Sequence, residues 1–195
     1  MRWFNSANGY IIINDVLIPS IYKLYETDYH NICFGVSERN ICARLAFHME
    51  NIMRSHSDWS IFQGYYADVE YNRMNNDDLK QYEDSKQLPR YMVSDLLIHS
   101  RDERRNYLAA ELKRKGNNKN VLKDKERLEA LVKPTHDNPD FICVCDTMVG
   151  AFITYSKKDV KIEIFENVNG SGVQTEIIEF LCRDDRVGHV LLIRI

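Results

Sequence analysis

The chain has 195 residues, of which 44% are hydrophobic and 28% charged, and its formal net charge is −3. This size suits one domain with extensions, and the composition excludes a globally disordered chain and an overall basic field that would attract nucleic acid. No apolar run approaches the roughly 20 residues of a membrane span, and the first residues lack the apolar stretch of a signal peptide. We therefore expect a cytoplasmic protein with no membrane partner.

The five cysteines indicate free thiols, because an odd count in a cytoplasmic chain is not typical of a disulfide framework. Cys143 and Cys145 would share one face of a strand. They could form half of a metal site, but no second pair of Cys or His has zinc spacing. Buried core positions are the favoured interpretation for both.

The N-terminal third contains the clearest helix. Residues 1–33 hold an apolar run at 10–13 and an expected helix at 21–29, and we interpret them as an extension. A helix is predicted over residues 37–53, because Ser37 is a good N-cap and an apolar stripe follows at helical spacing: Ile41, Leu45, Met49 and Ile52. Glu38 heads this stripe. Its carboxylate either complements the positive end of the helix dipole or points into a site at the helix tip.

The remaining elements are expected to form one mixed sheet. Residues 59–71 are rich in β-branched and aromatic residues and predict a strand, whereas the long polar segment 75–90 predicts a loop that is mobile without substrate. An amphipathic helix is predicted over 121–132, ended by Pro134. Further elements are predicted as follows: strands at 91–99, 107–113, 141–145, 151–155, 160–165 and 189–195, a turn at 146–150 and a short helix at 175–181. The fold class is therefore α/β or α+β, with a core at 34–166 and a C-terminal extension at 167–195.

The hairpin of strands 91–99 and 107–113 brings acidic side chains together. If its loop is centred on Glu103, Asp95 lies opposite Glu111, and the same register pairs Leu97 with Ala109 and His99 with Tyr107. Because strand side chains alternate between faces, Asp95, Glu111 and Lys113 share one face, while the other face is apolar. Cross-strand neighbours have Cβ atoms about 5 Å apart, and two carboxylates held this close repel each other and need a positive partner. Either a hard divalent cation or Lys113 as an ion-pair partner could supply it.

The acid–acid–lysine pattern resembles the PD-(D/E)XK nuclease superfamily, the restriction-endonuclease-like fold. The motif is present as Ser94-Asp95, followed sixteen residues later by Glu111-Leu112-Lys113. The helix begun by Ser37-Glu38-Arg39 is similar to the superfamily's first helix, whose acid often joins the site. The segment 68–73 also resembles small stand-alone bacterial proteins of this type. The resemblance covers residues 36–165, and Ser94 stands where the family usually has proline.

The resemblance implies a metal-dependent nuclease that uses Mg²⁺ or Mn²⁺. Asp95 and Glu111 would bind the metal with the main-chain carbonyl of Leu112, Glu38 would bind through water or hold a second metal, and Lys113 would orient the attacking water and stabilise the developing charge. The catalytic set is thus Asp95, Glu111, Lys113 and Glu38.

The substrate implied by this resemblance is nucleic acid, with DNA favoured over RNA. Basic residues are dense between Lys113 and Arg127, which indicates either a solvated helix face or a phosphate-facing patch. Lys115, Lys125, Arg73 and Tyr71 are the candidate phosphate contacts. Two other functions remain open: an inactive relative that binds nucleic acid or a protein, and an unrelated protein with a structural ion cluster. The apolar strand at 189–195 could pair with a second copy, so a homodimer is a further expectation.

Overall fold

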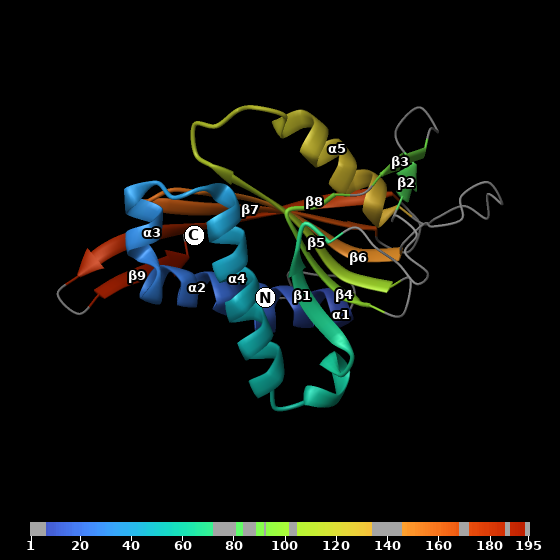
Figure 1. The fold of residues 1–195 in the computed structure, drawn as a ribbon, viewed down its shortest axis with the longest axis horizontal. Coiled ribbons are helices and arrows are strands. Elements are labelled where there is room, and N and C mark those ends of the chain that lie inside the picture. Colours follow the sequence, from blue (N-terminus) through green and yellow to red (C-terminus); the bar gives the residue numbers. More distant parts are fainter. Residues whose placement is uncertain are drawn as a thin grey trace.

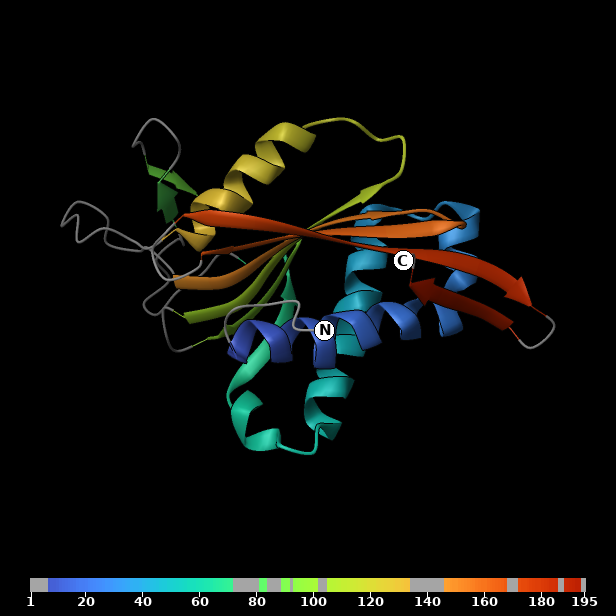
Figure 2. The same ribbon diagram turned by 180° about the vertical axis from the view of Figure 1, so that it is seen from behind.

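The structure, a computed structural model, describes residues 7–71, 81–83, 89–91, 93–101, 105–133, 146–167, 172–185 and 188–193. These residues form a seven-stranded mixed sheet that has helices on both faces (Figures 1 and 2). The predicted class, a mixed sheet flanked by helices, is confirmed.

The sheet has the spatial order β1-β4-β5-β6-β7-β8-β9. Its strands are β1 (Tyr65–Val69), β4 (Leu96–Ser100), β5 (Arg105–Arg114), β6 (Asp146–Tyr155), β7 (Asp159–Asn167), β8 (Val173–Asp185) and β9 (Gly188–Ile193). β5 and β6 pair in parallel, whereas the other neighbours in this sheet are antiparallel. Two parallel neighbours need a crossover connection, and α5 (Val121–Val132) lies in the chain between them.

The N-terminal segment is helical and packs into the same core as the sheet. Its elements are α1 (Ala7–Tyr10), the π-helical stretch η1 (Ile11–Leu17), α2 (Ile18–Thr27) and α3 (Tyr29–Phe34). Ile13, Leu17 and Tyr25 are fully buried in the hydrophobic cluster that also contains the sheet residues. The Tyr25 hydroxyl donates a hydrogen bond to the carbonyl oxygen of Ser156 over 2.6 Å, which fastens α2 to the turn between β6 and β7.

The helix predicted over 37–53 is α4 (Glu38–Ser55). The Ser37 hydroxyl accepts a hydrogen bond from the backbone N–H of Asn40, as expected of an N-cap. Three residues of the predicted stripe are fully buried: Ile41, Leu45 and Met49. Burial of a large apolar side chain of this kind stabilises the folded state by roughly 1.5–3 kcal/mol. Ile52 is only half-buried, and Cys42 and Met53 complete the buried face instead.

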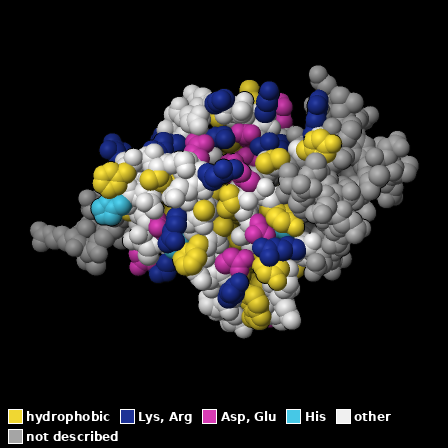
Figure 3. Space-filling view, in the orientation of Figure 1, with side chains coloured by type: hydrophobic (Ala, Val, Ile, Leu, Met, Phe, Trp, Pro, Cys, Tyr) yellow, Lys and Arg dark blue, Asp and Glu magenta, His cyan; other side chains and the backbone are white. Residues whose placement is uncertain are grey.

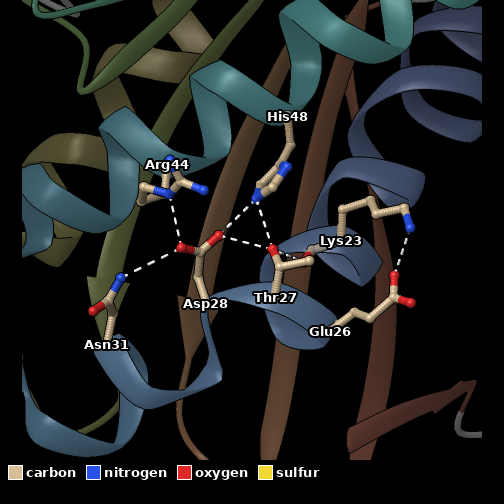
Figure 4. A network of polar contacts seen from close by, with 7 residues as sticks. All are labelled: Lys23, Glu26, Thr27, Asp28, Asn31, Arg44 and His48. Carbon is tan, nitrogen blue, oxygen red and sulfur yellow. Dashed lines mark hydrogen bonds and ion pairs between the residues drawn. The ribbon is translucent and has the colours of Figure 1, made fainter. Parts of the chain in front are cut away.

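A buried carboxylate joins the α2–α3 bend to α4 (Figure 4). Asp28 accepts hydrogen bonds from Nε of Arg44 and from His48, each over 2.7 Å, and from the Thr27 hydroxyl over 3.0 Å. Burial by itself would raise the pKa of Asp28, but Arg44 and His48 lower it below its usual value. This network fixes the angle at which the N-terminal helices meet α4.

The two faces of the sheet are covered by different helices. α4 and the N-terminal helices lie on one face, and α5 lies on the other (Figures 1 and 2). Leu128 and Leu131 of α5 pack in a second cluster with Leu97, Ala109, Val132, Phe152 and Phe165. Gly150 allows this close packing, because a Cβ there would meet Cβ of Leu128 at 3.2 Å. The helix at 121–132 is confirmed with the predicted bounds.

Several predicted strand bounds are wrong, for local reasons. Residues 59–62 form the 3-10 helix η2 (Trp59–Phe62), so the first strand is only β1. The predicted turn at 146–150 is part of β6, because it pairs continuously with β5. The predicted helix at 175–181 is part of β8, where pairing with β7 along its length overrides local helix propensity. β9 lies at the edge of the sheet.

The predicted loop at 75–90 lies largely outside the described residues. Its described parts include two short strands that pair with each other, β2 (Gln81–Glu83) and β3 (Pro89–Tyr91), so this segment is not wholly a loop. The single strand predicted over 91–99 is in fact two strands, β3 and β4. The predicted mobility of this loop concerns residues that lie mainly outside the described ranges. The strand predicted at 141–145 lies wholly outside them.

Among the described residues, Cys33, Cys42 and Cys182 form no disulfide bond. Cys143 and Cys145 lie outside the described residues. In the described ranges, no helix combines the length and the apolarity needed to cross a bilayer.

Candidate acid–lysine site

The β4–β5 hairpin places Asp95, Glu111 and Lys113 on the face covered by α5. Leu96 pairs with Ala110 and Leu97 with Ala109, as predicted, and this register, continued by one residue, places Asp95, just before β4, opposite Glu111. The apolar residues of the other face lie in the α4-side cluster, for example Leu96, Ala110 and Leu112. The alternation that the sequence predicted is therefore present where the acids lie.

At the far end of the hairpin the predicted register is wrong. The pairing shifts between Ile98 and His99, so that His99 stands opposite Asn106 rather than Tyr107. The extra residue turns Tyr107 to the α4 side, where its ring stacks on Tyr65 with centroids 3.9 Å apart. A bulge of this kind changes which side chains share a face without disturbing the acid pair.

The two carboxyl groups of the hairpin are held in a poorly hydrated environment. Oδ2 of Asp95 accepts a hydrogen bond from the backbone N–H of Leu112 over 2.8 Å. Burial raises the pKa of Asp95, although the Leu112 N–H and Lys113 oppose the shift. Glu111 is only 1% exposed. Burial raises its pKa to about 9, Asp95 and Asp124 add to the shift, and Arg127 opposes it.

Helix α5 contributes two charged side chains that the sequence did not assign to the site. Nε and Nη2 of Arg127 both donate to Oε1 of Glu111, over 3.0 and 2.6 Å. Nη2 also donates to Oδ1 of Asp124 over 2.8 Å. From the sequence, Arg127 was counted only as the last residue of the basic segment that begins at Lys113, and Asp124 was given no role in the site. Their separation of three positions, which places two helical side chains on one face, is the signal that could have indicated a shared role.

Lys113 is a half-buried cation in this cluster. Its Nζ lies 3.3 Å from Oδ2 of Asp124. Partial burial would lower the pKa of Lys113, but Asp124 and Asp95 raise it above its usual value. The side chain is therefore protonated at neutral pH and can supply charge, but it is not a proton acceptor.

Glu38 reaches the hairpin from the α4 side, beyond Lys113. Its Oε1 accepts hydrogen bonds from the backbone N–H of Arg114 and from the side-chain amide of Asn117, each over 2.9 Å. The charge of Glu38 also contributes to the raised pKa of Lys113. Glu38 thus lies at the rim of the site, where it fixes the end of β5.

Asp95, Glu111 and Glu38, the three acids predicted to serve a metal, do not form one group of ligands in the described part of the chain. There, no three side chains from Asp, Glu, His and Cys converge in a group that could hold a metal ion. Asp95 and Glu111 nevertheless offer adjacent carboxylate oxygens, the donors that Mg²⁺ and Mn²⁺ prefer. Oδ2 of Asp124 is a further buried oxygen, and it is already ion-paired with Nζ of Lys113 over 3.3 Å. The chemistry of these donors therefore fits a hard divalent cation held by Asp95 and Glu111, with the remaining ligands from main chain or water.

The predicted phosphate contacts are placed apart from one another. Lys115 forms an ion pair with Asp159, and Lys125 pairs with Glu163 over 2.7 Å, so both lysines already contact carboxylates of β7. Tyr71 packs on His99, with ring centroids 4.2 Å apart. Arg73 lies outside the described residues. On the face seen in Figure 3, basic and acidic side chains are interspersed rather than gathered into one basic field.

A second polar cluster lies beside the acid pair on the same sheet face. Asp68 of β1 stands opposite Leu97, and its carboxylate lies 3.0 Å from Nε2 of the fully buried His99. Nε and Nη2 of Arg101 donate to the same carboxylate over 3.0 and 2.8 Å. Burial alone would raise the pKa of Asp68, but these partners lower it to about 2. The cluster locks the edge strand β1 to β4.

Comparisons with known proteins identify no relative. No protein-family model, no curated protein and no solved structure matches the chain.

Proposed function

We propose that this protein is a metal-dependent nuclease with a restriction-endonuclease-like core, which hydrolyses phosphodiester bonds of nucleic acid, DNA in preference to RNA. The observation that carries the proposal is the placement of Asp95 opposite Glu111, with Lys113 two residues further along the same face. The element order supports it as well, since α4 precedes the antiparallel strands β1, β4 and β5, and α5 then leads to a strand parallel to β5.

The electrostatics of the site favour cation binding. Glu111 is almost completely buried beside Asp95, and an ionised carboxylate pair in such surroundings needs compensating positive charge. When bound, Mg²⁺ or Mn²⁺ would polarise the scissile phosphate and lower the pKa of a coordinated water. Asp95, held by the Leu112 N–H, and Glu111 would fix the position of that ion.

Lys113 has a separate role in the proposed reaction. Because Asp124 and Asp95 keep its pKa above the usual value, its ammonium can donate hydrogen bonds to a phosphoryl oxygen or an attacking water and stabilise the charge that develops there. Glu38 would act on this lysine and on the end of β5 rather than as a direct ligand. Lys115 and Lys125 are already paired with Asp159 and Glu163, so a substrate phosphate would have to share each lysine with a carboxylate or displace it.

A nicking assay on plasmid DNA, with an RNA substrate in parallel, tests the proposal. We expect Mg²⁺-dependent cleavage by the wild type, and at least about a hundredfold loss in Glu111→Ala and in Lys113→Ala, because each removes a group that stabilises charge. Glu129→Ala and Lys123→Ala are matched controls, since both side chains are exposed on α5. Wild-type cleavage rates in Glu111→Ala would contradict the assignment of the site.

One observation favours a second function, binding without catalysis. Arg127 already supplies positive charge to Glu111, so the acid pair can be compensated by the protein alone. A non-catalytic relative that binds nucleic acid or a protein partner would then retain the fold. Calorimetric titration with Mg²⁺ and Mn²⁺ separates the two, because only the nuclease requires specific metal binding that is lost in Glu111→Ala. A homodimer formed through the edge strand β9 is compatible with either function.

A further inference from the structure

Arg127 of α5 contacts the carboxylate that is central to the proposed metal site. Two of its nitrogens, Nε and Nη2, donate to the same oxygen, Oε1 of Glu111, over 3.0 and 2.6 Å. We propose that Arg127 and a divalent metal ion compete for this carboxylate, so that Arg127 sets the metal affinity of the site. The inference rests on the proposed function, which requires that Glu111 bind metal.

The competition follows from the burial of Glu111. With 1% of its surface exposed, this side chain has almost no access to water, and in its ionised form it needs a positive partner within contact distance. The two N–H groups of Arg127 occupy the lone pairs of Oε1, so a hard cation could use this oxygen only after Arg127 had left it. The two cations would also repel each other across a single carboxyl group. Glu111 can therefore be paired fully with only one of them.

The surrounding contacts allow Arg127 to leave Glu111 without becoming unpaired. Nη2 already donates to Oδ1 of Asp124 over 2.8 Å, one turn earlier on α5. The side chain of Arg127 is 20% exposed, so it lies next to solvent and can move outward by rotation of its own bonds. After such a rotation Asp124 would still be paired with Arg127. Asp124 would also remain paired with Lys113, whose Nζ is 3.3 Å from Oδ2 of Asp124. The exchange needs no movement of α5.

A purely structural ion pair is the alternative explanation, and stability does not separate the two. Removing Arg127 leaves Glu111 without its cation in both cases, so both predict a less stable protein when metal is absent. Metal affinity does separate them. A competing arginine weakens metal binding, and its removal strengthens binding, whereas a purely structural arginine organises the acids, and its removal weakens binding or leaves it unchanged.

The experiment is calorimetric titration of the full chain with Mn²⁺, with folding checked by circular dichroism. We expect Arg127→Met to bind Mn²⁺ at least about tenfold more tightly than the wild type, because the metal no longer displaces two charged hydrogen bonds. Arg127→Lys, which keeps the charge but cannot place two N–H groups of a planar fork on Oε1, should give an intermediate gain and carries the test if the Met variant does not fold. Lys123→Met is the matched control, since it removes a positive charge from an exposed position of the same helix.

The outcomes distinguish this inference from the proposed function. If the wild type binds Mn²⁺ and neither Arg127 variant binds it more tightly than Lys123→Met does, the competition is refuted while the nuclease proposal stands. If the wild type and both folded Arg127 variants fail to bind Mn²⁺, the metal-dependent function is refuted and the competition with it. An equal gain in Lys123→Met would assign the effect to net charge and would also overturn the role of Arg127.

Discussion

Oδ2 of Asp95 accepts a hydrogen bond from the backbone N–H of Leu112 over 2.8 Å, which ties the start of β4 to the strand that carries Glu111 and Lys113. The bond holds Asp95 beside Glu111, although the two carboxyl groups repel each other when both are ionised. Asp95 thus has two roles, as a hydrogen-bond acceptor and as a negative charge. An asparagine in its place would keep the first role and lose the second, because an amide oxygen can accept the same N–H but carries no charge.

Asp95→Asn should therefore preserve the hairpin and impair the metal site. We expect at least about a tenfold loss of Mn²⁺ affinity, and a free energy of unfolding without metal that is unchanged or higher, because repulsion with Glu111 is removed. Asp95→Ala should lose the hydrogen bond as well and lower the free energy of unfolding by about 1–2 kcal/mol. Urea unfolding in EDTA, with calorimetry on the same samples, measures both. A large destabilisation by Asp95→Asn would argue against repulsion in the pair.

Stability should decrease with rising pH because of Glu111. Burial raises its pKa to about 9, above the 4.5 of an ordinary glutamate, so the folded state binds this proton more strongly than the unfolded state does. The resulting stabilisation is fully present below pH 4.5 and is lost as the pH rises through about 9. Urea unfolding between pH 5 and about 9 in EDTA should show a steeper decline for the wild type than for Glu111→Gln, which has no proton to lose.

Metal affinity should show the opposite trend over the same range. A metal ligand must be ionised, so metal binding to Glu111 releases a proton and becomes tighter as the pH rises towards its pKa of about 9. Mg²⁺ titrations in buffers of different ionisation enthalpy would report the released proton. A pH-independent affinity would show that Glu111 is already ionised by Arg127 and would remove this coupling.

Glu38→Ala should loosen the end of β5. The substitution leaves the backbone N–H of Arg114 and the amide of Asn117 without their acceptor, so we expect a loss of about 1–2 kcal/mol in the free energy of unfolding. Glu38→Gln keeps an acceptor and should lose less than about 1 kcal/mol, mainly its interaction with the helix dipole. Mn²⁺ affinity should fall far less in either variant than in Asp95→Asn. An equal fall would place Glu38 among the direct ligands.

The Asp28 network offers a test of how the N-terminal helices are held. Asp28→Asn removes the charge that Arg44 and His48 share inside the protein, and we expect a loss of about 2 kcal/mol in the free energy of unfolding. Glu26→Gln is the matched control in the same view (Figure 4), because its ion pair with Lys23 is exposed and should contribute less than about 0.5 kcal/mol. If urea unfolding gave the same loss of unfolding free energy for both variants, the buried network would contribute no more stability than the exposed ion pair does.

The local pattern of the sequence determined the elements whose period is unambiguous. The helices at 38–55 and 121–132 follow from apolar spacing near 3.6 residues, with a capping serine for the first. The common face of Asp95, Glu111 and Lys113 follows from the two-residue period of strands joined in one hairpin. Such features depend only on backbone geometry within one element or between neighbouring elements, so they can be predicted from the sequence.

Contacts between distant segments were decided only by the tertiary structure. Residues 175–181 belong to a strand because β7 pairs with them, although their alternation of buried Ile178 and Phe180 gave a weak signal. Arg127 and Asp124 enter the site because α5, which connects β5 to β6 in the chain, covers the sheet face that carries Glu111. Glu38 contacts Arg114 because α4 packs on the opposite face. Charged side chains are long and pair with whichever opposite charge the fold brings near, and no local period records that choice.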